Sequence, residues 1–258
     1  MLNFNKKIIA KELKKFLKIY KHRPIKNNKN GMKINHMFAF FFLLKKLKPK
    51  YVIESGILRG QGTWLIEKTL PNTKIYSIDL DLSTRKFISK KVKYLDQDFK
   101  YFNDKIQPEK TLVFFDDHTC HYERLKQCKF LNIKQIIFED NYNVGDGDFN
   151  SLKHILNRKN FIHKTSFLTH LKTLIIFSIE IFKKILFSNY TVKIDRVNFR
   201  LRDRINKNNK FLLKNIKYML VFPKILSLIN DKKIRDEVKK NYPDEIKSYN
   251  SFTYIQLR

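Results

Sequence analysis

Acidic residues end, or closely follow, a series of short apolar segments in this 258-residue chain. Carboxylates at such positions can accept hydrogen bonds from ribose hydroxyls, hold a divalent cation or take a proton from a substrate. Three glycines follow the first acid, and a glycine lets the backbone approach a ligand where a Cβ would clash. The sequence therefore predicts a polar, nucleotide-like ligand site. Its candidate residues are Glu54, Gly56, Gly60, Gly62, Asp79, Asp98, Asp116, Asp117, Glu139 and Asp140.

Strand-like and helix-like segments alternate between residues 51 and 138. Such alternation is typical of βαβ units in a doubly wound sheet, where right-handed crossovers bring the carboxyl ends of parallel strands to one edge. We therefore predict an α/β fold with a Rossmann-like, mostly parallel sheet and the acids along one edge. The expected strands are 51–54, 74–79, 92–95, 111–116 and 134–138, and the expected helices are 63–70, 83–90, 100–106 and 120–130.

The residues outside this core predict additions to it. An apolar stripe at helical spacing runs through the first helix, a second helix covers 35–46, and an apolar helix covers 171–187. The stripe consists of Ile9, Leu13, Phe16 and Tyr20, which favours packing on the domain, with binding to a membrane surface or a partner left open. The predicted division is a helical N-terminal extension over 1–50, a Rossmann-like core over 51–160, a helical or irregular insertion over 161–245 and a closing strand within 246–258.

The spacing of the glycines narrows the class of ligand. The motif is Gly-x-x-x-Gly-x-Gly, whereas dinucleotide-binding loops use Gly-x-Gly-x-x-Gly. A nicotinamide or flavin enzyme is therefore disfavoured. Asp79, at the end of the second expected strand, is placed to accept hydrogen bonds from a ribose.

Four motifs, in order, resemble those of class I S-adenosylmethionine-dependent methyltransferases. Val-Ile-Glu-Ser-Gly-Ile-Leu-Arg-Gly-Gln-Gly-Thr at 52–63 and Ile-Tyr-Ser-Ile-Asp-Leu-Asp at 75–81 are similar to the first two motifs. Phe-Phe-Asp-Asp-His at 114–118 and Phe-Glu-Asp-Asn-Tyr at 138–142 are similar to motifs of the cephalosporin-hydroxylase-like, small-molecule O-methyltransferase branch. Phe115 stands where that branch has its first acid, so the acidic role there passes to Asp116 or Asp117. The resemblance runs over residues 50–155 and extends to the last strand.

The resemblance implies a class I methyltransferase fold and a role for each matching residue. S-adenosylmethionine is the implied cofactor, and a hydroxyl of a small molecule or glycan is the implied methyl acceptor. The implied cofactor contacts are Glu54 and Gly56 at its methionine end, Gly60, Gly62 and Thr63 in the loop beside it, Asp79 at the ribose, Asp98 near the adenine, and Asp116.

Metal-dependent members of the family imply a Mg²⁺ site at the ends of the fourth and fifth strands. Here its ligands would be Asp117 or Asp116 together with Glu139, Asp140 and Asn141, and hard oxygen ligands suit this ion. A metal-free enzyme remains the alternative. The candidate catalytic residues are His118, His121 and Asp117, because a nucleophilic hydroxyl must lose its proton.

Two other function classes remain open. Asp146 and Asp148, in Gly145-Asp146-Gly147-Asp148, resemble the metal-nucleotide motif of sugar-nucleotide glycosyltransferases. The other open class is a non-catalytic one: a basic protein with a methyltransferase fold that associates with membrane or RNA. Calorimetry with S-adenosylmethionine and with a sugar nucleotide separates these classes.

The formal net charge of +30 indicates attraction to polyanions, or else the lysine-rich composition of an AT-rich genome. The chain carries no RNA-binding signature, so nucleic acid is the less favoured partner. The two cysteines fit a reducing compartment. We expect a cytoplasmic protein, with peripheral contact to an anionic membrane and a homodimer both left open.

Overall fold

The computed structural model describes residues 6–143, 146–147, 150–156 and 210–258. The chain divides into two compact units, Met1–Asn141 with Ile216–Arg258 as the first and Tyr142–Asn215 as the second. The sheet and the candidate site belong to the first unit. The predicted helix over 171–187 lies outside the described residues.

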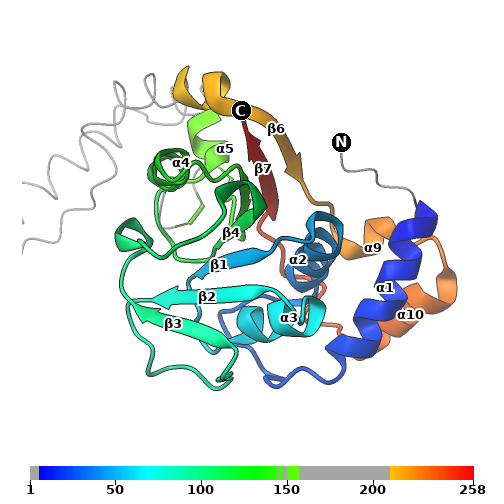
Figure 1. Cartoon of the computed structure of the whole chain (residues 1–258). Helices are drawn as coiled ribbons and strands as arrows, with labels where there is room; N and C mark the ends of the chain where they lie inside the picture. The colour runs from blue at the N-terminus through cyan, green and yellow to red at the C-terminus, as the bar shows by residue number, and fades with distance from the viewer. Residues whose placement is uncertain (1–5, 144–145, 148–149, 157–209) are drawn as a thin grey trace, which may run out of the picture. The chain divides into compact units, whose positions relative to one another are not determined.

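The first unit is built on a seven-stranded sheet with the order β3-β2-β1-β4-β5-β7-β6 (Figure 1). Strands β1 to β5 are parallel, and β7 is antiparallel to both β5 and β6. The predicted α/β fold with a mostly parallel sheet is thereby confirmed. The strands are β1 Tyr51–Ser55, β2 Lys74–Asp79, β3 Val92–Asp96, β4 Thr111–Phe115, β5 Gln135–Phe138, β6 Ile216–Val221 and β7 Thr253–Leu257.

Both faces of this sheet are covered. Neighbouring residues of a strand point to opposite faces, so Phe114 and Phe115 of β4 show what packs on each. On one face, Phe114 of β4 stacks on Phe40 of α2, with the ring centroids 4.2 Å apart. On the other face, Phe115 packs against Phe99 and Phe138, and His121 of α4 stacks on Phe138. The helices of the first unit are α1 Lys6–Tyr20, α2 Ile34–Leu47, α3 Gln61–Thr69, α4 His121–Phe130, α9 Ile225–Leu228 and α10 Lys232–Asn241.

The N-terminal helices form part of this core. Every residue of α2 from Ile34 to Leu44 is buried, and Figure 1 shows α1 beside α9 and α10. The apolar stripe of α1 is buried as well: Ile9, Leu13, Phe16 and Tyr20 are each at most 1% exposed. This burial favours the packing interpretation of the stripe. None of the described helices is long and apolar enough to cross a membrane.

Two predicted helices are wrong. Residues 83–90 form turns and coil. The N–H groups of Lys86 and Phe87 donate to the carbonyl of Arg59, in the glycine loop between β1 and α3, and not to a helical neighbour. Within 100–106, only a 3-10 turn at Phe99–Tyr101 forms, and Asp98 caps it. Strand β6 was not predicted from the sequence, because it lies in the segment 161–245 that was expected to be a helical or irregular insertion.

Gly56 joins the ends of β1 and β4 by close backbone contact. Its φ is +94°, and a Cβ there would overlap the carbonyl oxygen of Asp116. We expect Gly56→Ala to lower the free energy of unfolding by about 3 kcal/mol. The alanine would be strained at this positive φ, and the backbone at Asp116 would also have to move away from the new Cβ. Urea unfolding measures this loss. Gly31→Ala is the control, because its Cβ meets only the side chain of Asn28; an equal cost for the two variants would contradict the prediction.

Candidate active site

The loop between β1 and α3 is held by an acid from the next strand. The Asp79 carboxylate accepts hydrogen bonds from the N–H groups of Ile57 at 2.7 Å and Leu58 at 3.2 Å. Leu58 has φ +49° and Gly60 has φ +87°, so the loop is tightly curved. Asp79 therefore fixes the shape of the loop, and it lies at the edge where the sequence predicted a ribose contact.

Glu54 lies buried under this loop. The hydroxyls of Thr63 and Ser77 both donate to its Oε2, and a Cβ on Gly62 would overlap its Oε1. Burial raises the pKa of Glu54 to about 7, although the two hydroxyl donors act to lower it. In the described structure, Glu54 and Thr63 therefore bind each other beneath the loop.

This raised pKa predicts a specific pH dependence of stability. Between pH 4.5 and 7 the folded protein keeps a proton on Glu54 that the unfolded chain has released, so rising pH destabilises the fold. The shift corresponds to about 3 kcal/mol. We expect Glu54→Gln to gain about that much relative to the wild type when urea unfolding is repeated from pH 4 to pH 8. Parallel pH curves for the two proteins would contradict the prediction.

Gln61 was missed by the sequence analysis. It is the first residue of α3, directly after Gly60, and it is 3% exposed. Neither its Oε1 nor its Nε2 has a hydrogen-bond partner among the described residues. A buried polar group without a partner costs about 1–3 kcal/mol. The sequence did offer one signal: Gln61 lies between two glycines of the motif, where a large polar side chain suggests a functional role.

Arg124 of α4 neutralises two of the predicted acids. Its guanidinium binds both carboxylate oxygens of Asp98, at 2.9 and 3.0 Å, and Asp117 Oδ2 at 2.8 Å. The hydrogen bonds from Arg124 lower the pKa of Asp98, whereas burial outweighs them and raises the pKa of Asp117. Ser55 also donates to Asp117. Asp117 is thus committed to internal contacts, which narrows the set of acids that can hold a cation.

The other acids gather at the ends of β4 and β5. Ligand atoms of Asp116, His118 and Asp140 all lie within 4.8 Å of one another, and the same holds for His36, Glu139 and Asp140. Loss of hydration, together with the charges of Glu139 and Asp140, raises the pKa of Asp116 well above its usual range. Burial and the neighbouring Asp140 do the same to Glu139. A cation or shared protons would relieve this crowding of like charges.

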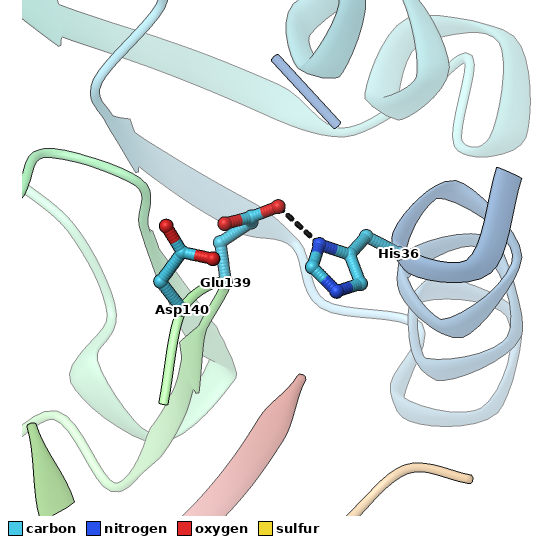
Figure 2. Close-up of side chains that lie close together, drawn as sticks. All are labelled: His36, Glu139 and Asp140. Carbon is cyan, nitrogen blue, oxygen red and sulfur yellow. Dashed lines mark hydrogen bonds and ion pairs between the residues drawn. The ribbon is translucent and has the colours of Figure 1, made fainter. Parts of the chain in front are cut away.

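His36 of α2 is the second residue that the sequence analysis missed. Its Nδ1 pairs with Glu139 Oε1 (Figure 2), and its Nε2 accepts the Asn250 N–H at 3.0 Å. Burial lowers the pKa of His36 to about 4, although the charge of Asp140 opposes the shift. The only sequence signal was a polar Asn35-His36 pair in an otherwise apolar helix.

The remaining predicted residues are placed as follows. His118 is exposed, with φ +51°, just after β4. His121 is 3% exposed and stacked on Phe138, away from solvent. The Asn141 side chain donates to Thr253. In the second unit Asp146 is exposed, and Asp148 lies outside the described residues.

Comparisons with known proteins find similarity at the level of solved structures. No protein-family model and no curated protein matches the chain. The O-methyltransferase TomG from Streptomyces achromogenes, solved with SAM, is 8% identical, with a TM-score of 0.49 over 96% of this chain and 88% of that one. An O-methyltransferase from Bacillus cereus, solved with SAH, is 12% identical, with a TM-score of 0.44 over 96% and 91%.

A CmcI structure with SAH is 13% identical, with a TM-score of 0.38 over 43% of this chain. The match spans 62% of that CmcI chain, which is less than two thirds. Because these three TM-scores lie below 0.5, we base the proposed function on the chain's own residues.

Proposed function

We propose that the protein is an S-adenosylmethionine-dependent methyltransferase that acts on a hydroxyl of a small molecule or glycan. One observation carries the proposal: the loop that Asp79 anchors leads into a helix whose first residue, Gln61, keeps a buried amide without a partner among the described residues. A ligand with donors and acceptors at this edge would satisfy that amide. The glycine spacing, which disfavours a dinucleotide, supports the same choice.

The chain's residues fit this cofactor at the β1 and β2 ends of the edge. The first N–H groups of α3 lack intrahelical partners and favour a carboxylate. Asp79 lies at the end of β2, where acids bind ribose hydroxyls. Bound S-adenosylmethionine would supply an electrophilic methyl group. Asp98 is bound by Arg124, so we assign it to positioning the β3 end of the site rather than to direct adenine contact.

The acids at the β4 and β5 ends fit a divalent cation. Asp116, Glu139 and Asp140 provide hard oxygen ligands, which suit Mg²⁺. Asp117 and Asn141 are engaged by Arg124 and Thr253, so the proposed ligand set is narrower than the sequence predicted. A cation bound there would neutralise the carboxylates and polarise a coordinated hydroxyl.

His118 is the proposed general base. It is exposed at the same edge, and its ring nitrogen lies within 4.8 Å of carboxylate oxygens of Asp116 and Asp140. Neighbouring carboxylates can orient an imidazole by hydrogen bonding. His121 is buried against Phe138, which favours a packing role for it. The chain thus contributes orientation of the acceptor and removal of its proton.

Calorimetry with Gln61→Leu tests the cofactor proposal. We expect the wild type to bind S-adenosylmethionine and the variant to bind it at least about tenfold more weakly, because Leu cannot form the hydrogen bonds. The ligand-free variant should unfold at the same urea concentration or a higher one, since an unsatisfied amide is removed. Gln107→Leu, at the opposite edge of the sheet, is the control. A wild type that does not bind, or equal affinities of the wild type and Gln61→Leu, would refute the proposal.

A further inference from the structure

His36 comes from a helix that the sequence separated from the cofactor-binding core, yet it contacts the end of β5. His36 is 3% exposed and lies 103 residues from Glu139 along the chain. Figure 2 shows the Glu139 carboxylate turned toward the His36 ring, with Asp140 on the side of Glu139 away from that ring.

The hydrogen bonds of His36 fix the position of its proton. Nε2 accepts the backbone N–H of Asn250, so Nε2 carries no proton. A neutral ring must then be protonated on Nδ1, which faces Glu139 Oε1. Nδ1 is therefore a donor to the carboxylate and is not available as a ligand for a cation, although it lies close enough to be one.

The segment before β7 holds this arrangement in place. Besides donating to His36, Asn250 donates from its side chain to Asp140 Oδ1 at 2.9 Å, and its carbonyl accepts the N–H of Asn141. The preceding residue of α2, Asn35, donates to the carbonyls of Ile246 and Ser248. Helix α2 thus contacts both Glu139 and the segment that leads into β7.

We propose that His36 is a positioning residue, whose Nδ1–H orients the Glu139 carboxylate for binding of a divalent cation beside Asp140. The inference rests on the cation site of the proposed function but not on methyl transfer. Partners that orient a metal ligand are worth about 10- to 100-fold in metal affinity.

Two amide substitutions separate the two hydrogen bonds of the ring. The amide of Asn branches at Cγ, as Nδ1 does, so His36→Asn keeps a donor to Glu139 and loses the acceptor for Asn250. The longer His36→Gln places its amide oxygen near Nε2, so it keeps the acceptor for Asn250 and loses the donor to Glu139. Both variants leave the metal ligands themselves unchanged.

Binding of Mn²⁺, measured by calorimetry and electron paramagnetic resonance, is the readout. We expect His36→Asn to retain the wild-type affinity within about threefold and His36→Gln to lose at least about tenfold. Equal affinities of the two variants would overturn the proposal, whether both are lost, as for a direct ligand, or both are retained. A wild type that binds no Mn²⁺ would overturn it as well.

Nitrogen-15 spectroscopy of labelled histidine tests the same proposal without a variant. The His36 ring should carry its proton on Nδ1 both before and after Mg²⁺ is added, and a proton on Nε2 would overturn the proposal. Calorimetry with S-adenosylmethionine on the same samples keeps the two proposals distinct. Failure to bind that cofactor would refute the methyltransferase function. The proposal for His36 is tested independently of that cofactor, by cation affinity.

Discussion

Replacing His118 by Asn is expected to lower kcat for methyl transfer by about 100- to 10,000-fold, which is the usual contribution of a general base. An amide cannot take the proton of an acceptor hydroxyl. Asn is the substitution of choice because residue 118 has φ +51°, a conformation that Asn tolerates better than most residues. The loss should therefore reflect chemistry and not misfolding.

The measurement is transfer of labelled methyl from S-adenosylmethionine to a panel of phenols, catechols and sugars. Binding of the cofactor should remain within about threefold of the wild type, because His118 follows β4 and not the glycine loop. His22→Asn is the matched control, since His22 is exposed in the turn after α1, outside the site. Full activity of His118→Asn would exclude His118 as the base.

Replacing Asp79 by Ala is expected to weaken binding of S-adenosylmethionine by about 100-fold. Two effects combine: the N–H groups of Ile57 and Leu58 lose their acceptor, and the ribose loses its own. Together they correspond to about 3 kcal/mol of binding free energy. The free energy of unfolding should fall by about 1–3 kcal/mol, because the curved loop no longer has its anchor.

Asp81→Ala is the control for this loss. It removes the same charge two residues later, from an exposed carboxylate that bonds Ser83. Calorimetry of both variants separates an effect of position from an effect of net charge. A loss in Asp81→Ala as large as that in Asp79→Ala would show that charge alone explains the binding.

Much of the fold follows from patterns that are local in the sequence. The five parallel strands form within one or two residues of their predicted bounds, since each is a short apolar run between breakers. The helix predicted over 83–90 does not form for a long-range reason: the carbonyl of Arg59 accepts N–H groups that the helix would have needed. Strand β6 was missed because its alternating burial depends on pairing with β7.

The residues of the candidate site also differ in how far the sequence predicted them. The sequence alone placed the glycines of the β1–α3 loop, Asp79 and the acids after β4 and β5 at one edge of the sheet, because the carboxyl ends of parallel strands meet there. The contacts that each of these side chains makes follow from the packing of distant segments. Arg124 withdraws Asp98 and Asp117 by pairing with them, and Gln61 is left with a buried amide. His36 reaches Glu139 from a helix that no local pattern connected to the site. Hydrogen bonds and ion pairs between distant segments fix side-chain roles, and they exist only once the chain has packed.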